Sequence, residues 1–202
     1  MTQELSEKEQ NHLDDYLINA ASIGETRTVR LVLASGADVH AHEDGALRLA
    51  ALDGHTETVQ VLLAAGADAH AHGDYALRWA AYKGHTETMK VLLAEGANVH
   101  AHDDEAVRWA SHRGLTETVQ VLAANIFDAD SWCGKSRAEI ETVAAALYER
   151  IKANNPQNPI TPERLRTAGA ILLDCALTCW EQVRPPPPKL QISPLPAQPR
   201  PV

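Results

Sequence analysis

Four glycines, Gly24, Gly54, Gly84 and Gly114, recur every 30 residues, and a similar stretch of sequence follows each of them. The stretch is His-Thr-Glu-Thr-Val after Gly54 and His-Thr-Glu-Thr-Met after Gly84. A second stretch, Ala-Leu-Arg-Leu-Ala-Ala at 46–51, returns 30 residues later as Ala-Leu-Arg-Trp-Ala-Ala. A fixed period of this length is typical of stacked repeats, in which each unit packs only on its neighbours. The chain is therefore predicted to fold as a solenoid.

Each unit has the pattern of two short helices. Asp44 and its equivalents Asp74 and Asp104 stand before the first helix, where we expect their carboxylates to cap its free amides. The second helix is predicted to begin near Thr56 in the second unit and to end before Gly66, with apolar residues at helical spacing. Helices this short are unstable alone, so both must bury their apolar sides against the neighbouring unit.

These units resemble the ankyrin repeat family. The sequence at 54–68, Gly-His-Thr-Glu-Thr-Val and then Val-Leu-Leu-Ala-Ala-Gly-Ala-Asp, is similar to the second-helix and turn signature of that family. The family's usual repeat is about 33 residues long and starts with Thr-Pro-Leu-His, whereas this period is 30 and the start is Ala-Leu-Arg, so we expect a shortened connecting finger. The resemblance implies an all-α helix-turn-helix solenoid over 1–125. Its four repeats lie at about 6–36, 37–66, 67–96 and 97–125.

Beyond position 125 the period is lost, and residues 126–184 are predicted to form a pair of helices. Ser136-Arg137-Ala138-Glu139 has the form of a capping box that opens the first helix, and Pro162 suits the first position of the second. Both helices carry an apolar stripe that needs a partner. We expect the pair to close the exposed end of the stack. A separate docking module is the alternative.

Residues 185–202 form a proline-rich tail that holds eight of the eleven prolines of the chain. Such a segment is predicted to be extended polyproline II or disordered, and dispensable for folding of the repeats. Within it, Pro-Ala-Gln-Pro-Arg at 196–200 resembles a short proline-and-arginine ligand for aromatic grooves. The tail is therefore a candidate site for a second partner.

Charge and cysteine content restrict the partners and the compartment. Eighteen Lys and Arg against 27 Asp and Glu give a net charge of −9, which repels a nucleic acid. The first residues lack the apolar run of a secretory signal, and no apolar stretch is long enough to span a bilayer. Three cysteines are typical of a reducing compartment. We expect no nucleic-acid or membrane partner, and a cytoplasmic protein or one delivered into a host cell.

A weak phosphate-binding motif occurs after the repeats. Residues 129–136, Ala-Asp-Ser-Trp-Cys-Gly-Lys-Ser, fit its loosest form, which would suit a small nucleotide-binding protein. Asp128 and Asp130 would repel phosphate, however, and Trp132 is too bulky for a loop that wraps its amides around an anion. We expect Ser136 simply to cap a helix.

Three His-Ala-His pairs suggest a metal-binding sensor as an alternative function, because alternate residues of an extended segment point the same way. We favour a structural role in which the first histidine of each pair bonds the loop backbone. No nucleophile stands beside an obvious base, so we expect neither an enzyme nor a cofactor. The pairs lie at His40 and His42, His70 and His72, and His100 and His102.

The ankyrin resemblance implies a protein-binding module whose first helices line a concave groove. The 30-residue variant is similar to repeats of large DNA viruses and some bacteria, which indicates a host-directed or regulatory role. Two tryptophans and a tyrosine among cations have the composition of interface hot spots. Alternatively, Trp79 and Trp109 fill the gap between repeats under Arg78 and Arg108. The groove positions carried over from the family are Leu49, Trp79 and Trp109, then Leu52, Tyr82 and His112, and then Asp53, Lys83 and Arg113.

Overall fold

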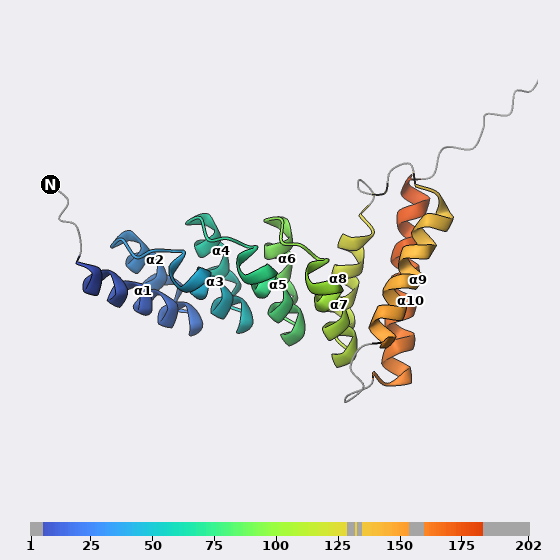
Figure 1. Cartoon of the computed structure of the whole chain (residues 1–202), viewed down its shortest axis with the longest axis horizontal. Helices are drawn as coiled ribbons and strands as arrows, with labels where there is room; N and C mark the ends of the chain where they lie inside the picture. The colour runs from blue at the N-terminus through green and yellow to red at the C-terminus, as the bar shows by residue number, and fades with distance from the viewer. Residues whose placement is uncertain (1–5, 129–131, 133–134, 154–159, 184–202) are drawn as a thin grey trace, which may run out of the picture.

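The computed structural model describes residues 6–128, 132, 135–153 and 160–183, which form ten α-helices and no strand (Figure 1). The proline-rich tail and most of the phosphate-loop segment lie outside the described residues. The predicted all-α fold is confirmed. The helices are α1 (Glu7–Ser22), α2 (Thr26–Ala34), α3 (Ala41–Leu52), α4 (Thr56–Ala64), α5 (Ala71–Lys83), α6 (Thr86–Ala94), α7 (Ala101–Arg113), α8 (Thr116–Ile126), α9 (Arg137–Ala153) and α10 (Pro162–Val183).

The first eight helices form four helix-turn-helix units that stack side by side. The first helices α1, α3, α5 and α7 make one row, and the second helices α2, α4, α6 and α8 make another (Figure 1). Each second helix after the first repeat begins at the predicted threonine. The period alone therefore located the helices correctly, because every unit must present the same apolar stripes to its neighbours.

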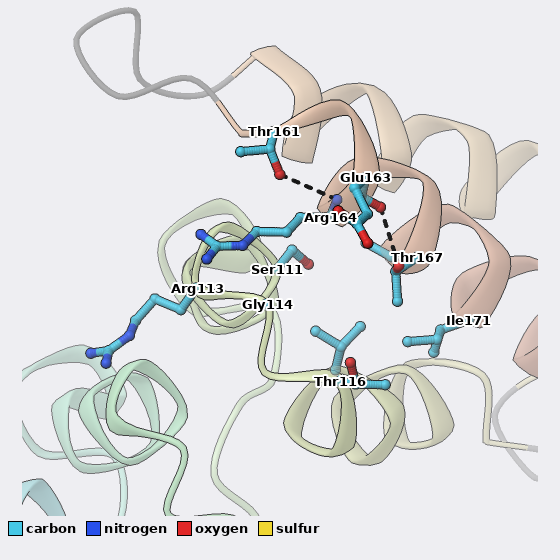
Figure 2. A pocket seen from close by; sticks show the side chains of 11 residues that line it. Ser111, Arg113, Gly114, Thr116, Thr161, Glu163, Arg164, Thr167 and Ile171 are labelled. Atoms are coloured by element: carbon cyan, nitrogen blue, oxygen red, sulfur yellow. Dashed lines mark hydrogen bonds between the residues drawn. The ribbon is translucent and has the colours of Figure 1, made fainter.

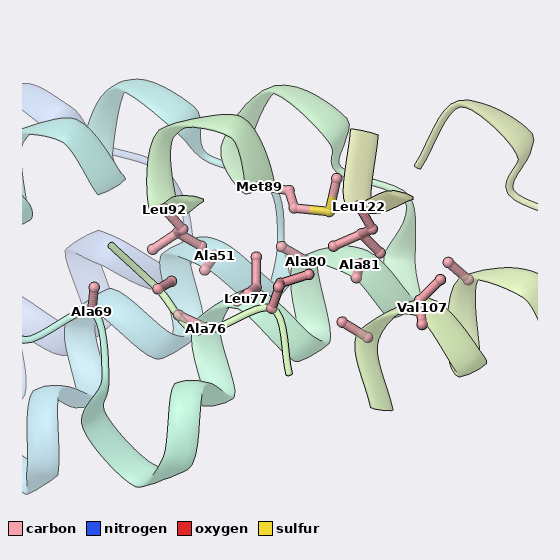
Figure 3. Close-up of a cluster of buried hydrophobic side chains, with 14 of the residues drawn as sticks. Ala51, Ala69, Ala76, Leu77, Ala80, Ala81, Met89, Leu92, Val107 and Leu122 are labelled. Atoms are coloured by element: carbon pink, nitrogen blue, oxygen red, sulfur yellow. The ribbon is translucent and has the colours of Figure 1, made fainter. Parts of the chain in front are cut away.

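Small side chains let the first helices approach one another closely. Ala50 and Ala51 in α3, and Ala80 and Ala81 in α5, are completely buried. Larger apolar side chains from the second helices close over them, with Met89, Leu92 and Leu122 meeting Leu77 in one continuous core (Figure 3). Each such leucine contributes about 1.5–3 kcal/mol by leaving water. The core therefore runs continuously through the repeats, from each one to the next.

The turn before each first helix corrects one prediction. In the second repeat, His42, Glu43 and Asp44 all have left-handed backbone conformations, with φ between 53° and 57°. This turn carries the carboxylate of Asp44 away from its own helix, so it is not an ordinary N-cap. Its Oδ1 accepts the backbone N–H of Asp68 in the next repeat at 2.8 Å. The expected capping role of this aspartate is wrong; it links two repeats.

The same link recurs along the stack, always over 24 residues. Asp14 accepts the amide of Asp38 at 2.8 Å, and Asp74 accepts the amide of Asn98 at 2.7 Å. The three carboxylates are buried, and a buried carboxylate needs such donors. A second series joins the second helices through threonine hydroxyls. Its pairs are Thr26 with Thr58, Thr56 with Thr88, and Thr86 with Thr118.

The helical pair α9 and α10 packs against α7 and α8 at the end of the stack (Figure 1). The predicted capping box is confirmed, since Ser136 Oγ accepts the amide of Glu139 at 3.3 Å while the Glu139 carboxylate accepts the amide of Ser136 at 2.7 Å. These hydrogen bonds lower the pKa of Glu139. Pro162 is the first residue of α10, as predicted. Both apolar stripes face the stack or each other.

Two arginines of this pair make the bonds that a fifth repeat would otherwise make. Arg164 of α10 donates to the carbonyl of His112 at 2.6 Å, and the equivalent carbonyl of Ser22 lies 3.1 Å from the Nε2 atom of His55 in the next repeat. Arg150 of α9 pairs with the buried carboxylate of Asp104. These contacts support the interpretation of the helical pair as an end cap.

Candidate partner-binding surface

The nine predicted groove residues lie on one surface, formed by the solvent-facing sides of α3, α5 and α7. We call it the first-helix face. Leu49, Trp79 and Trp109 are partly buried, as are the residues at the next predicted position. The three residues at the third predicted position, Asp53, Lys83 and Arg113, are exposed. The register of the repeats therefore brings the predicted residues together in three parallel rows.

Four aromatic side chains on this face contact one another across two repeats. Trp79 is in ring contact with Tyr75 and Tyr82 of its own helix, at centroid distances of 5.5 and 5.3 Å. Trp109 of the next repeat contacts Trp79 at 5.5 Å and Tyr82 at 5.4 Å, both edge to face. These four residues are called the aromatic cluster below. Such ring pairs contribute about 0.5–1.5 kcal/mol each beyond their buried area.

Three arginines cover parts of the aromatic cluster. Arg78 lies 5.9 Å from the ring centroid of Trp109, and Arg113 lies 4.6 Å from that of Tyr82. Arg78 also forms an ion pair with Glu105 at 2.6 Å, too bent for a hydrogen bond, with both side chains less than one-fifth exposed. The third, Arg48, lies over Tyr75. The cations hold the rings in place while leaving each of them partly exposed.

The geometry of the two tryptophans has features of both expected placements, in the groove and between the repeats. Trp79 and Trp109 do bridge adjacent repeats, and Arg78 does lie over Trp109. Both rings nevertheless keep solvent-exposed area on the first-helix face. In addition, the indole N–H of Trp79 is buried and makes no hydrogen bond within the described chain. A buried indole N–H ordinarily donates to a hydrogen-bond acceptor. Because the Trp79 N–H does not, a hydrogen bond does not set the position of this ring.

One predicted residue faces the cap, and two contributors to the face were missed. The His112 ring nitrogen Nε2 lies 3.2 Å from the carbonyl of Ile151 in α9, so its ring is held by the helical pair. Tyr75 and Arg48 belong to the face but were not predicted. Tyr75 stands four residues before Trp79, and that helical spacing was the signal that would have placed it beside the tryptophan.

The histidine pairs do not converge on a common point. The Nδ1 atom of His40 lies 3.2 Å from Asp44 Oδ1 within the same turn, whereas His42 Nε2 lies 3.5 Å from Asp15 in the preceding repeat. The first histidine of the pair therefore contacts a carboxylate, and the expected ring bond to the loop backbone is wrong. Among the described residues, no group of three or more His, Cys, Asp or Glu could hold a metal ion.

The described part of the phosphate-loop segment has structural contacts. Trp132 donates its indole N–H to the carbonyl of Ile126 at 2.8 Å and lies against the ring of Phe127.

Burial raises the pKa of the Cys175 and Cys179 thiols on α10, which disfavours their reactive thiolate form. Over the described ranges, no helix is long and apolar enough to cross a membrane.

A cavity of about 500 Å³ lies between the turn that joins α7 to α8 and the start of α10 (Figure 2). Several polar side chains of its lining form hydrogen bonds within the protein. The Ser111 hydroxyl donates to a carbonyl of its own helix at 2.7 Å, and the Thr167 hydroxyl donates to the carbonyl of Glu163 at 3.1 Å. The Arg164 side chain crosses the edge of the cavity and donates to the carbonyl of His112 in α7. The cavity thus marks the junction between the stack and the C-terminal helical pair.

A family model matches part of the chain. The family model described as ankyrin repeats (three copies) matches residues 47–133, which include α4 to α8 and the second half of α3. No curated protein matches the chain significantly. The matched region contains every residue of the aromatic cluster, and the structure shows the helix-turn-helix stacking that the resemblance implied. The repeats within residues 47–133 of this chain are therefore ankyrin repeats.

Proposed function

We propose that the chain is a non-enzymatic interaction module that binds another protein through the first-helix face. Ankyrin repeats are in general protein–protein interaction modules. The observation that carries the proposal is the aromatic cluster, whose four rings are partly exposed in a single patch. Large aromatic side chains surrounded by arginines are the composition of interface hot spots, because they supply contact area at low entropic cost.

The charge around the cluster favours a protein partner over a nucleic acid. Lys83 and Arg113 are exposed beside the rings, but Asp15 and Asp53 are exposed on the same row of first helices. The net charge of the chain is −9. A polyanion would be repelled at long range, whereas a folded protein or peptide can match charges of both signs at short range.

The test is affinity capture from an extract of the source organism, followed by mass spectrometry, with three forms of the full chain. The wild type is compared with K83E/R113E, which reverses two exposed charges at the cluster. The control is R27E/K90E, which makes the same change in net charge on the second helices, where Arg27 and Lys90 are exposed. A protein captured by the wild type and the control, but not by K83E/R113E, supports the proposal. Equal capture by all three forms would refute it.

A further inference from the structure

A second recess on the first-helix face lies one repeat away from the tryptophans. It has a volume of about 330 Å³ and opens between α1, α3 and α5. Tyr75 of the aromatic cluster forms one of its walls, so the recess and the cluster are continuous. The lining residues are Asp15, Ile18, His42, Gly45, Arg48, Leu49 and Tyr75.

The recess exists because one repeat lacks a side chain that the others have. Gly45 occupies the position that holds Asp15 in the first repeat, Tyr75 in the third and Glu105 in the fourth. A Cβ atom built on Gly45 would lie 3.3 Å from Ile18 Cδ1 and 3.3 Å from His42 Cβ, so a side chain here would press on two walls of the recess. The backbone of Gly45 needs no glycine, since it is not among the residues with positive φ. The glycine therefore leaves this part of the recess wall without a side chain.

The walls of the recess select an aromatic occupant. Ile18 and Leu49 offer aliphatic surface, and the ring of Tyr75 offers an aromatic face. The Arg48 guanidinium lies 5.3 Å from the Tyr75 centroid and donates to the carbonyl of His42 at 2.8 Å, so its plane is fixed at the edge of the recess. A fixed guanidinium attracts a ring more than an aliphatic chain. Asp15 and His42 pair with each other at the rim and leave the interior apolar.

We propose that the recess at Gly45 is an anchor pocket that takes one aromatic side chain of the partner protein. This inference rests on the proposed function, because the same face must bind the partner. The occupant inserts beside Tyr75, and the rest of the partner then lies along the aromatic cluster. Arg48 is a specificity residue in this arrangement, since its guanidinium contacts the inserted ring directly.

The test uses N-acetyl-phenylalaninamide as the probe and NMR of the isotopically labelled full chain as the readout. We expect saturable shifts at the Gly45 amide and at the methyl groups of Ile18 and Leu49. N-acetyl-leucinamide should bind more weakly at the same signals. The G45Y variant transplants the tyrosine of the third repeat into the recess and should weaken probe binding by at least about tenfold, a loss of about 1.4 kcal/mol.

A matched control and a graded variant make the result decisive. Q120Y places the same tyrosine on the exposed side of α8, outside the recess and away from the aromatic cluster, and should leave probe binding unchanged within about twofold. G45A fills the recess only in part and should give an intermediate loss even where G45Y folds poorly. Thermal melting of each variant verifies its fold. Shifts that are absent, that cluster elsewhere, that are equal for the leucine probe, or that persist in G45Y and G45A would overturn the pocket.

The pocket and the proposed function can be refuted independently by these two experiments. Probe binding needs no partner, whereas affinity capture needs no occupied pocket. If K83E/R113E abolishes capture but the probe does not bind at Gly45, the pocket is wrong and the interaction module stands. If the probe binds at Gly45 but capture is insensitive to K83E/R113E, the proposed protein-binding role of the face is wrong.

Discussion

Replacing Asp74 with glycine distinguishes a helix cap from a link between repeats. The Asp74 carboxylate is buried and accepts the backbone N–H of Asn98 in the next repeat at 2.7 Å. The Nδ1 atom of His70 also lies 3.0 Å from it. Asp74 has φ 57°, a conformation that costs most residues about 1–2 kcal/mol but that glycine adopts freely. D74G therefore removes the carboxylate without adding backbone strain.

The two interpretations predict different magnitudes. A helix cap replaced by glycine loses only a few tenths of a kcal/mol. A hydrogen bond to a charged group contributes about 1.5–3 kcal/mol, and the half-exposed His70 contact adds at most about 1 kcal/mol. D74G should therefore lower the free energy of unfolding by about 2–4 kcal/mol. D74N keeps an acceptor oxygen and tolerates the left-handed backbone, so it should cost less than about 1 kcal/mol.

Urea unfolding followed by circular dichroism and by tryptophan fluorescence measures both variants. With a slope of about 2 kcal/mol per molar urea, D74G should shift the midpoint down by about 1–2 M. Two of the four tryptophans, Trp79 and Trp109, lie in the two repeats that the link joins, and Trp132 and Trp180 report the region after the repeats. A midpoint shift for D74G of about 0.2 M or less, equal to that of D74N, would refute the link and restore the capping role.

Three further outcomes follow from the cap, the cluster and the thiols. R150A/R164A should lower the free energy of unfolding by about 1–3 kcal/mol, because it removes the donors to the buried Asp104 carboxylate and to the His112 carbonyl. Unchanged urea unfolding curves would contradict the role of the helical pair as an end cap. W79A/W109A should abolish partner capture, a loss of about 2 kcal/mol or more in binding, while the stack stays helical; loss of cooperative melting would assign both rings to the inter-repeat core. Iodoacetamide at pH 8 should modify residues 175 and 179 more slowly in native protein than in urea, since burial raises both thiol pKa values; equal rates by peptide mapping would contradict this.

The period made most of the helical stack predictable. Positions 30 residues apart must be structurally equivalent, so the boundaries of one helix fix those of the others. The local chemistry of the turn was not predictable in the same way. An aspartate before a helix is usually an N-cap, and nothing in the sequence of His42, Glu43 and Asp44 shows three successive residues with positive φ. This turn places the Asp44 carboxylate beside the backbone N–H of Asp68.

The sequence predicted the candidate surface only where the 30-residue register of the repeats determines the position of a residue. The register placed Trp79 and Trp109 in one row, and the structure brings their rings into contact. It could not show that α9 would cover the ring of His112, because the helical pair lies outside the period. The sequence also did not predict the recess at Gly45. A missing side chain becomes visible as a cavity only when the walls from α1 and α5 are in place.

The four repeats themselves separate positions that build the stack from positions that shape its surface. The aspartate that links repeats is the same residue in all four units, and the paired small residues of the first helix stay small because neighbouring helices must pack there. On the first-helix face the residue type changes from unit to unit, as from Gly45 to Tyr75 and from Leu49 to Trp79. Packing between identical units would be served equally well by identical residues. We therefore expect the variation to serve the proposed partner, since an asymmetric row of side chains fits an asymmetric partner.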